Sequence, residues 1–121
     1  MTVLLVDDEE SIIKTVSLCL RLKGYKVIAA QDGEHAVITA HKKVPDVIVL
    51  DVAMPGLNGF VVIEKIKQSI HISNIPIIIL SAYGQEEYRQ KAKELGIEEY
   101  MLKPFEPDHL IEVIEKVTGE K

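Results

Sequence analysis

Residues 2–10 read TVLLVDDEE, and this stretch decides how the rest of the chain is interpreted. A run of apolar and β-branched residues leads directly into two adjacent aspartates, Asp7 and Asp8, and two glutamates follow. The apolar run predicts a buried strand, while the like charges at its end repel one another. We therefore expect a positive charge from elsewhere in the fold to lie beside the end of this strand.

Short apolar runs alternate with amphipathic stretches along the chain. Apolar residues at helical spacing, with glycine or proline near the boundaries, predict the helices. Ser11 is the expected cap of the first helix and Gly24 its stop, and Ile70 is expected on the buried face of the third helix. The predicted strands are 2–6, 26–30, 46–50, 75–80 and a short one within 98–103, and the predicted helices are 11–24, 33–42, 59–70, 85–95 and 107–117.

The predicted strands consist almost entirely of Ile, Val and Leu and show no alternation of apolar and polar residues. Strands of this kind are buried on both faces, which is typical of a parallel sheet covered by helices on each side. The length of 121 residues suits one domain with a single core. The pattern therefore predicts a single α/β domain made of five βα units.

Polar side chains lie where four of the predicted strands end. These residues are Asp7 and Asp8 after the first strand, Asp51 after the third, Ser81 after the fourth and Lys103 after the fifth. Open α/β sheets bind ligands outside the carboxyl ends of their strands, where the strand order reverses. For five units in the order 2-1-3-4-5 that point lies between the first and third strands, and the three aspartates would then converge in one crevice, with Ser81 and Lys103 beside it.

Three clustered carboxylates need a compensating positive charge. A site of oxygen ligands with room for water suits Mg²⁺ or Mn²⁺ better than zinc. A metal on one side and Lys103 on the other would flank Asp51 and favour an incoming phosphoryl group. A carboxylate can act as the nucleophile in such a transfer and carry an aspartyl phosphate.

Four segments carry a resemblance to a known family. LLVDDEE (4–10), VIVLDVAMPGLNG (47–59), IIILSA (77–82) and YMLKPF (100–105) resemble the receiver domain of bacterial two-component response regulators, in particular the single-domain chemotaxis regulators. The resemblance covers the whole chain in the right order. It implies one receiver domain over residues 1–121 with a flavodoxin-like doubly wound (βα)5 fold, in which a five-stranded parallel sheet has the order 2-1-3-4-5 and helices on both faces.

The resemblance also implies roles for the residues at the predicted strand ends. Asp51 corresponds to the phosphoacceptor, and Lys103 would pair with the phosphoryl oxygens. Asp8 would bind Mg²⁺ directly and Asp7 largely through water, while Asp51 and the backbone carbonyl of Ala53 would complete the protein ligands. Mn²⁺ is expected to substitute for Mg²⁺. The bond between Lys103 and Pro104 is cis in this family.

A switch between two states follows from the same resemblance. Phosphorylation of Asp51 would favour the state in which Ser81 and Tyr100 turn inward. The face formed by helix 85–95, strand 99–102 and helix 107–117 would then be presented to a partner. The expected phosphodonor is a histidine kinase or a histidine phosphotransfer protein. The output would pass to a separate effector protein, or to an effector domain if the chain is cut from a longer regulator.

Composition excludes several other classes. The net charge of −5 and the lack of a dense Lys/Arg cluster argue against direct nucleic-acid binding. No apolar run approaches the ~20 residues that cross a bilayer, and no secretory signal begins the sequence. The single cysteine, Cys19, fits a reducing compartment. We therefore expect a cytoplasmic protein without a membrane partner.

Four alternative functions remain to be weighed against the switch. A flavin carrier of the same fold would need a Ser/Thr- and Gly-rich loop after the first strand, and a nicotinamide enzyme would need GxGxxG there, where this chain has DDEES. A haloacid-dehalogenase-type phosphatase would need a second aspartate at Ala53. The fourth alternative is a receiver-like module that binds proteins without being phosphorylated. The resemblance implies a signalling switch that catalyses only its own phosphorylation and dephosphorylation, and not a metabolic enzyme.

Overall fold

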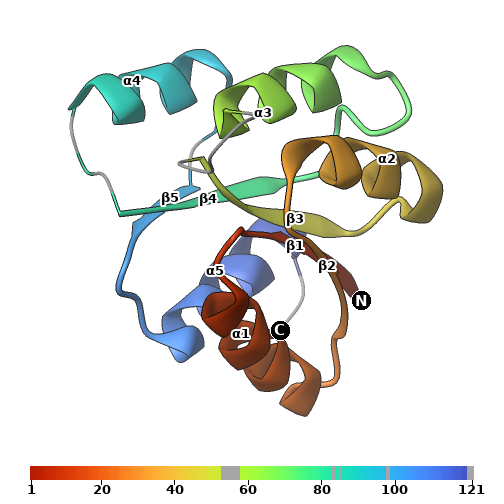
Figure 1. Ribbon diagram of the computed structural model, residues 1–121, viewed down its shortest axis with the longest axis vertical. Helices are drawn as coiled ribbons and strands as arrows, with labels where there is room; N and C mark the ends of the chain where they lie inside the picture. Colours follow the sequence, from red (N-terminus) through yellow and green to blue (C-terminus); the bar gives the residue numbers. More distant parts are fainter. Residues whose placement is uncertain (53–57, 83, 85, 98, 120–121) are drawn as a thin grey trace.

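Strands and helices alternate strictly along the chain in the computed structural model, which describes residues 1–52, 58–82, 84, 86–97 and 99–119 (Figure 1). The strands are β1 (Thr2–Val6), β2 (Lys26–Ala30), β3 (Val47–Asp51), β4 (Ile77–Ser81) and β5 (Glu99–Leu102). The helices are α1 (Glu10–Leu22), α2 (Gly33–Lys43), α3 (Gly59–Gln68), α4 (Glu86–Glu94) and α5 (Pro107–Thr118). No helix within these ranges is both long enough and apolar enough to cross a membrane.

The strands form one parallel sheet in the order β2-β1-β3-β4-β5, which confirms the predicted fold class. Val3 pairs with Val27 of β2 on one side and with Val47 of β3 on the other. The chain therefore runs outward from β1 to β2, and then returns past β1 to build the rest of the sheet from β3. The strand order reverses between β1 and β3, so the carboxyl ends of these two strands flank the place where this fold binds ligands.

The sheet separates two apolar layers. α2, α3 and α4 cover one face and α1 and α5 cover the other (Figure 1). Side chains of β1 alternate between the layers, since Leu4 and Val6 pack under α2 and α3 whereas Val3 and Leu5 pack against α1 and α5. Each of these four side chains is fully buried. This explains why the strand sequence shows no alternation, because both of its faces lie in a core.

The edge strand β2 differs from the expectation that every strand is buried on both faces. Lys26 and Ala29 are exposed, and Val27 and Ile28 are only partly buried. The guanidinium of Arg21 on α1 donates to the carbonyl oxygen of Val27 at 3.3 Å. As an edge strand, β2 is thus partly open to solvent, unlike the central strands.

The prediction that Ser11 caps the first helix is wrong. α1 begins at Glu10 with Glu9 as its N-cap, so Ser11 lies inside the first turn. The backbone N–H of Glu9 donates to Oδ1 of Asp7 at 2.9 Å, and the Glu9 carbonyl accepts from Ile12 and Ile13 at 3.1 Å. Asp7 thus turns the chain directly from β1 into α1, and the helix starts earlier than the sequence indicated.

Two predicted boundaries between the third helix and the fourth strand are also wrong. α3 ends at Gln68, so Ile70 leaves the helical face and is 84% exposed, while Ile72 is fully buried in its place. The backbone N–H of Ile75 donates to the Ile72 carbonyl in a turn, which delays the start of β4 to Ile77. At its other end, β4 includes Ser81, which pairs with Leu102 of β5, rather than ending before it.

Candidate functional site

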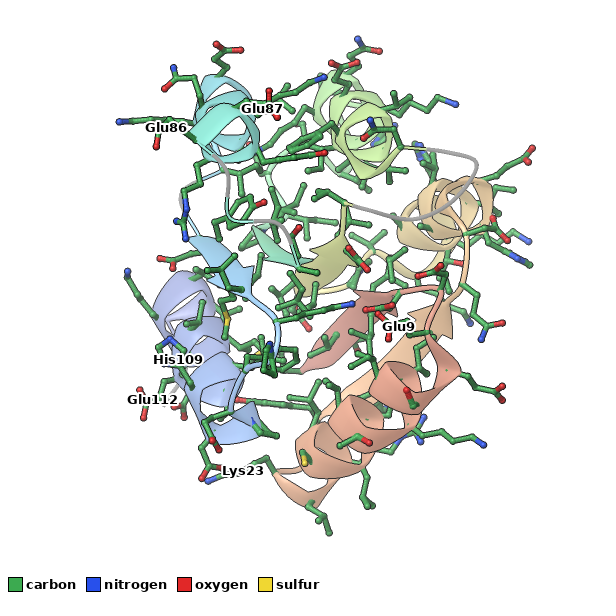
Figure 2. The ribbon with its side chains drawn as sticks, turned by 60° about the vertical axis from the view of Figure 1, so that its left-hand side comes forward. Glu9, Lys23, Glu86, Glu87, His109 and Glu112 are labelled. Carbon is green, nitrogen blue, oxygen red and sulfur yellow. The ribbon has the colours of Figure 1, made fainter. Side chains whose placement is uncertain are left out.

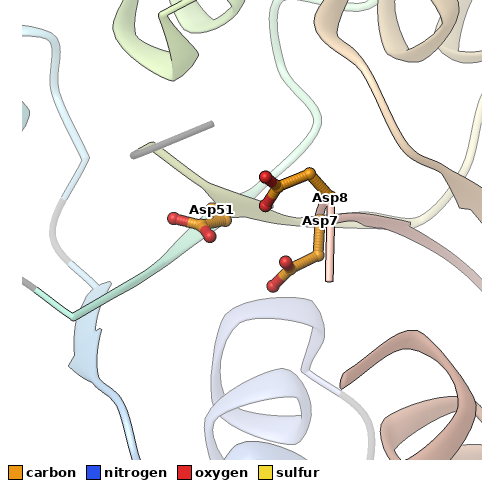
Figure 3. Close-up of side chains that lie close together, drawn as sticks. All are labelled: Asp7, Asp8 and Asp51. Carbon is orange, nitrogen blue, oxygen red and sulfur yellow. The ribbon is translucent and has the colours of Figure 1, made fainter. Parts of the chain in front are cut away.

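The carboxyl ends of β1 and β3 bring three aspartates together. Val6 pairs with Leu50 in the register of the two strands, so Asp7 and Asp51 follow side by side. Asp8 comes next on the β1 side. Figure 3 shows the three carboxylates facing a common space at the edge of the sheet. The structure therefore brings together the aspartates that the sequence placed at the strand ends.

One ligand oxygen from each of Asp7, Asp8 and Asp51 lies within 4.8 Å of the other two. Asp7 is fully buried and Asp51 is only 4% exposed, whereas Asp8 is exposed to solvent. Buried carboxylates are rarely stable without a compensating positive charge. An oxygen-only ligand set with one open, hydrated side is the kind that Mg²⁺ prefers. These side chains thus fit a divalent cation.

Lys103 supplies a positive charge from the end of β5. Its Nζ donates to Oδ2 of Asp7 at 2.9 Å, to Oδ2 of Asp51 at 2.9 Å and to Oε1 of Glu9 at 3.0 Å. Its side chain is 10% exposed. This is the positive charge that the opening stretch of the sequence required, and it comes from a residue 96 positions away from Asp7.

Glu9 is the residue of this cluster to which the sequence analysis assigned no role. Its place beside the paired aspartates was visible in the sequence, but nothing local showed that its side chain turns back toward the end of β5 rather than into solvent. The backbone N–H of Glu9 is held by Asp7, and its side chain is directed by the ion pair with Lys103 at 3.0 Å. With Glu9 included, three carboxylates accept from a single ammonium group, and Asp8 lies beside two of them.

The surroundings shift two of the ionisable groups. Burial raises the pKa of Asp7 above its ordinary value, and the hydrogen bonds from Lys103 and from the Glu9 backbone lower it only in part. Burial alone would lower the pKa of Lys103, but the hydrogen bonds to Asp7, Asp51 and Glu9 outweigh it and raise that pKa well above its ordinary value. Lys103 is therefore a permanent cation. A further positive charge nearby would stabilise the ionised form of the Asp7 carboxylate.

Backbone packing supports the end of β3. A Cβ atom at Gly59, the first residue of α3, would lie 2.4 Å from Cα of Val52 and 2.8 Å from the carbonyl oxygen of Asp51. Only glycine allows this close approach. Asn58 caps the same helix, because its Oδ1 accepts from the Phe60 backbone N–H at 2.8 Å. The start of α3 thus packs directly against the backbone of Asp51 and Val52 at the end of β3.

The other residues that the sequence analysis singled out lie on β4 and β5, except Ala53. Ser81 is fully buried as the last residue of β4, and its carbonyl accepts from the Lys103 backbone N–H at 2.8 Å. Tyr100 is half-buried on β5. The peptide bond between Lys103 and Pro104 is cis, as the resemblance implied. Ala53, the expected carbonyl ligand, lies outside the described residues.

This arrangement is suited to the transfer of an anionic group onto Asp51. Its carboxylate has a cation fixed at 2.9 Å on one side and an acidic, metal-compatible space on the other. Charges of this kind stabilise a transferring phosphoryl group without taking part in covalent chemistry.

Comparison with known proteins gives a consistent result. A family model for the response regulator receiver domain matches residues 3–115. The chain is 44% identical over 108 residues to the probable transcriptional regulator ycf27 of Guillardia theta, a match that covers 89% of this chain and 41% of that protein. The chain thus spans less than half the length of this relative.

Solved structures agree with the family match. The chemotaxis response regulator CheY4 of Vibrio cholerae superposes with a TM-score of 0.89 at 35% identity, covering 96% of this chain and 97% of that one. The receiver domain of the sensor histidine kinase PA1611 from Pseudomonas aeruginosa, with a magnesium ion coordinated in its active site cleft, has a TM-score of 0.89 at 28% identity and covers 98% of both chains.

Proposed function

The chain belongs to the response regulator receiver domain family, and from that membership we propose that it carries its phosphoryl group on the carboxylate of Asp51. Receiver domains are signalling switches that receive phosphate from histidine kinases or phosphotransfer proteins and bind Mg²⁺ at an acidic pocket. The observation that carries the assignment is the position of Asp51, nearly buried, 2.9 Å from Lys103 and beside Asp7 and Asp8.

The transfer step follows from these positions. A carboxylate oxygen of Asp51 attacks the phosphorus of a phosphohistidine, and the P–N bond breaks with its electron pair left on the imidazole nitrogen, which then takes up a proton. The product is an acyl phosphate. Lys103 lies where it can hold a phosphoryl oxygen, and the Ser81 hydroxyl would contact another. Bound Mg²⁺, or Mn²⁺ in its place, would neutralise phosphoryl charge.

The ligands of that cation are part of the proposal. Asp8 would bind it directly, because its exposed carboxylate faces the open side of the cluster. Asp7 would act mainly through water, since Lys103 and the Glu9 backbone already occupy its oxygens. A carboxylate oxygen of Asp51 and the carbonyl of Ala53 would complete the set. The same site would catalyse the loss of the phosphoryl group to water.

The output face is proposed to be α4, β5 and α5. A cavity of about 390 Å³ opens on this face, lined by Arg89, Tyr100, Leu102, Phe105 and others. Leu102 is 41% exposed, so the cavity has an apolar rim of the kind that binds a partner. The proposed recipient of the signal is a separate effector protein. The alternative recipient is a further domain of the kind that a transcriptional regulator carries.

Intact mass measurement tests the acceptor assignment. We expect one phosphoryl adduct after incubation with acetyl phosphate and Mg²⁺, and none when Mg²⁺ is chelated or in Asp51→Asn. Asp46→Asn is the matched control, because Asp46 precedes the opposite end of β3 and accepts from the Thr2 backbone N–H at 2.7 Å. A folded wild-type protein that forms no adduct would instead support the phosphorylation-independent binding module.

A further inference from the structure

The ring of Phe60 joins α3 to α4. Phe60 is the second residue of α3 and is 2% exposed. Its ring stacks on that of Tyr88 of α4, with 6.1 Å between the centroids and 22° between the planes. Nζ of Lys91, one turn further along α4, lies 5.3 Å from the centroid of the Phe60 ring. Both contacts are attractive, so they hold α4 to the first turn of α3.

α4 is only lightly anchored in the core. Ala92 is the only buried side chain of Glu86–Glu94, and Tyr88 is partly buried. Figure 2 shows α4 next to α3 on the same side of the sheet, with Glu86 and Glu87 of its first turn directed away from the rest of the molecule. Elements with few buried side chains are the ones that move most readily in a folded domain. The position of α4 therefore depends strongly on its contact with Phe60.

The residues before Phe60 reach the phosphoacceptor. A Cβ atom at Gly59 would lie 2.4 Å from Cα of Val52 and 2.8 Å from the carbonyl oxygen of Asp51. The N–H of Gly59 donates to the Val52 carbonyl at 3.2 Å, and Oδ1 of Asn58 accepts from the Phe60 N–H at 2.8 Å. Closely packed backbone transmits a displacement, because it leaves no space to absorb one. A shift of the Asp51 backbone is therefore passed to Phe60.

We infer that the stacked pair of Phe60 and Tyr88 carries the phosphorylation signal from Asp51 to α4. This inference rests on the proposed function, since it concerns the effect of a phosphoryl group on Asp51. New bonds to the phosphoryl group and the metal pull on the end of β3, and the first turn of α3 moves with it. The link runs through α3 and does not use Ser81 or Tyr100. Because α4 belongs to the proposed output face, the ring pair sets how strongly that face senses the phosphoryl group.

Beryllofluoride, a phosphoryl mimic, tests the link at saturating Mg²⁺. The backbone amide signals of α4 and of Lys103 are recorded by NMR with and without the mimic in wild type, Tyr88→Leu and Tyr88→Phe. Tyr88→Phe is the matched control, because it keeps the ring and removes only the hydroxyl. We expect the mimic to shift the α4 signals in wild type and in Tyr88→Phe. In Tyr88→Leu the α4 signals should lose most of this shift, while the Lys103 signal shifts in all three proteins.

Hydrogen exchange without the mimic gives a second readout. The α4 amides of Tyr88→Leu should exchange about fivefold faster than those of the wild type, the scale of one aromatic pair, and those of Tyr88→Phe should not. An increase of this size leaves α4 helical, so a lost shift does not reflect an unfolded helix. Phe60→Leu keeps an apolar side chain in the core and should reproduce Tyr88→Leu in both measurements.

Two results would overturn the inference. One is a full shift of the α4 signals in both Tyr88→Leu and Phe60→Leu. The other is a lost shift in Tyr88→Phe, because the hydroxyl rather than the ring would then carry the signal.

The proposed function fails in a different way. It is refuted if the folded wild-type protein neither binds beryllofluoride nor forms the Asp51 adduct, and the link to α4 is then refuted with it. Binding of the mimic with equal α4 shifts in all variants leaves Asp51 as the acceptor and removes only the role of the ring pair.

Discussion

The guanidinium of Arg89 on α4 lies over the ring of Tyr100 on β5, with 5.0 Å between its Cζ atom and the ring centroid. Cation–π contacts at exposed sites contribute about 0.5–1 kcal/mol. On the proposal that Tyr100 turns inward on phosphorylation, that turn would break this contact, and Arg89 would favour the state in which the contact is made. We expect Arg89→Ala to raise the inward population of Tyr100 about threefold in the unphosphorylated protein, measured from the NMR signals of its ring.

Lys91→Ala is the control for this prediction. Lys91 lies on the same helix, but its Nζ is 5.3 Å from the ring centroid of Phe60 and not over Tyr100. If both variants changed the Tyr100 signals equally, a general loosening of α4 would explain the effect and the specific role of Arg89 would be lost.

Replacing Lys103 should destabilise the fold and abolish phosphorylation together. Lys103→Met leaves the buried carboxylates of Asp7 and Asp51 without their cation, and we expect a loss of about 3 kcal/mol in the free energy of unfolding. Urea denaturation at pH 7 without Mg²⁺ measures this loss. Added Mg²⁺ should recover part of it, because a bound cation supplies the missing charge.

Lys116→Met is the matched control for Lys103. Its Nζ lies 2.7 Å from Oε1 of Glu99, but its side chain is 71% exposed. The Glu99 side chain is 19% exposed, but the lysine lies largely in water, so the pair should contribute only about 1 kcal/mol and this variant should unfold almost as the wild type does. Equal losses in the two lysine variants would show that burial does not govern the strength of these ion pairs.

Asp7→Asn should stabilise the metal-free protein at neutral pH. The pKa of Asp7 is raised on folding, chiefly by burial, so the folded state binds its proton more readily than the unfolded state does. This protonation stabilises the fold fully below the ordinary aspartate pKa and is lost as the pH rises through the raised value. At pH 7 the ionised carboxylate is therefore unfavourable, and we expect Asn to gain about 1 kcal/mol, the scale of one buried polar group.

Two further measurements check whether Asp7→Asn stabilises the protein for the stated reason. The advantage of Asp7→Asn should shrink as the pH is lowered toward the ordinary aspartate pKa, because the wild-type residue is then protonated as well. Saturating Mg²⁺ should also reduce it, since the metal stabilises the ionised wild-type site. A variant that is less stable than the wild type at pH 7 without Mg²⁺ would contradict the assigned effect of burial.

Gly59→Ala should damage both stability and the metal site. The new Cβ would meet the backbone of Val52 and Asp51 at 2.4 and 2.8 Å, and backbone cannot move aside as a flexible side chain can. We expect a loss of about 2 kcal/mol in the free energy of unfolding, together with weaker Mg²⁺ binding as the end of β3 shifts. Urea denaturation and a Mg²⁺ titration measure the two effects.

Gly84→Ala provides the comparison. Its Cβ would approach only the side chain of Leu102, at 3.1 Å, and Gly84 is exposed. We expect a change within about 0.5 kcal/mol and unaltered Mg²⁺ binding. Similar losses in both variants would indicate a general cost of replacing glycine rather than a specific contact behind Asp51.

Most of the fold could be predicted because its signals are local. Apolar runs without alternation indicated strands buried on both faces, and the central strands β1, β3 and β4 follow this pattern. Helix periodicity located all five helices, but not all of their ends. The start of α1 depends on a hydrogen bond from Glu9 to Asp7, and the end of α3 depends on a turn that buries Ile72 instead of Ile70. Such contacts leave no periodic trace in the sequence.

The sequence by itself determined which residues lie at the carboxyl ends of the strands, because the apolar runs stop at Asp7, Asp51, Ser81 and Lys103. Only the tertiary structure decided how these ends meet. Strand register sets Asp7 beside Asp51, and the closing of β5 against β4 brings Lys103 within hydrogen-bond distance of carboxylates that are 52 to 96 positions away. The contact of the Glu9 side chain with Lys103 is likewise decided only by the tertiary structure. Each of these contacts depends on the packing of the sheet and its helices, and packing is a property of residues that are distant in the chain.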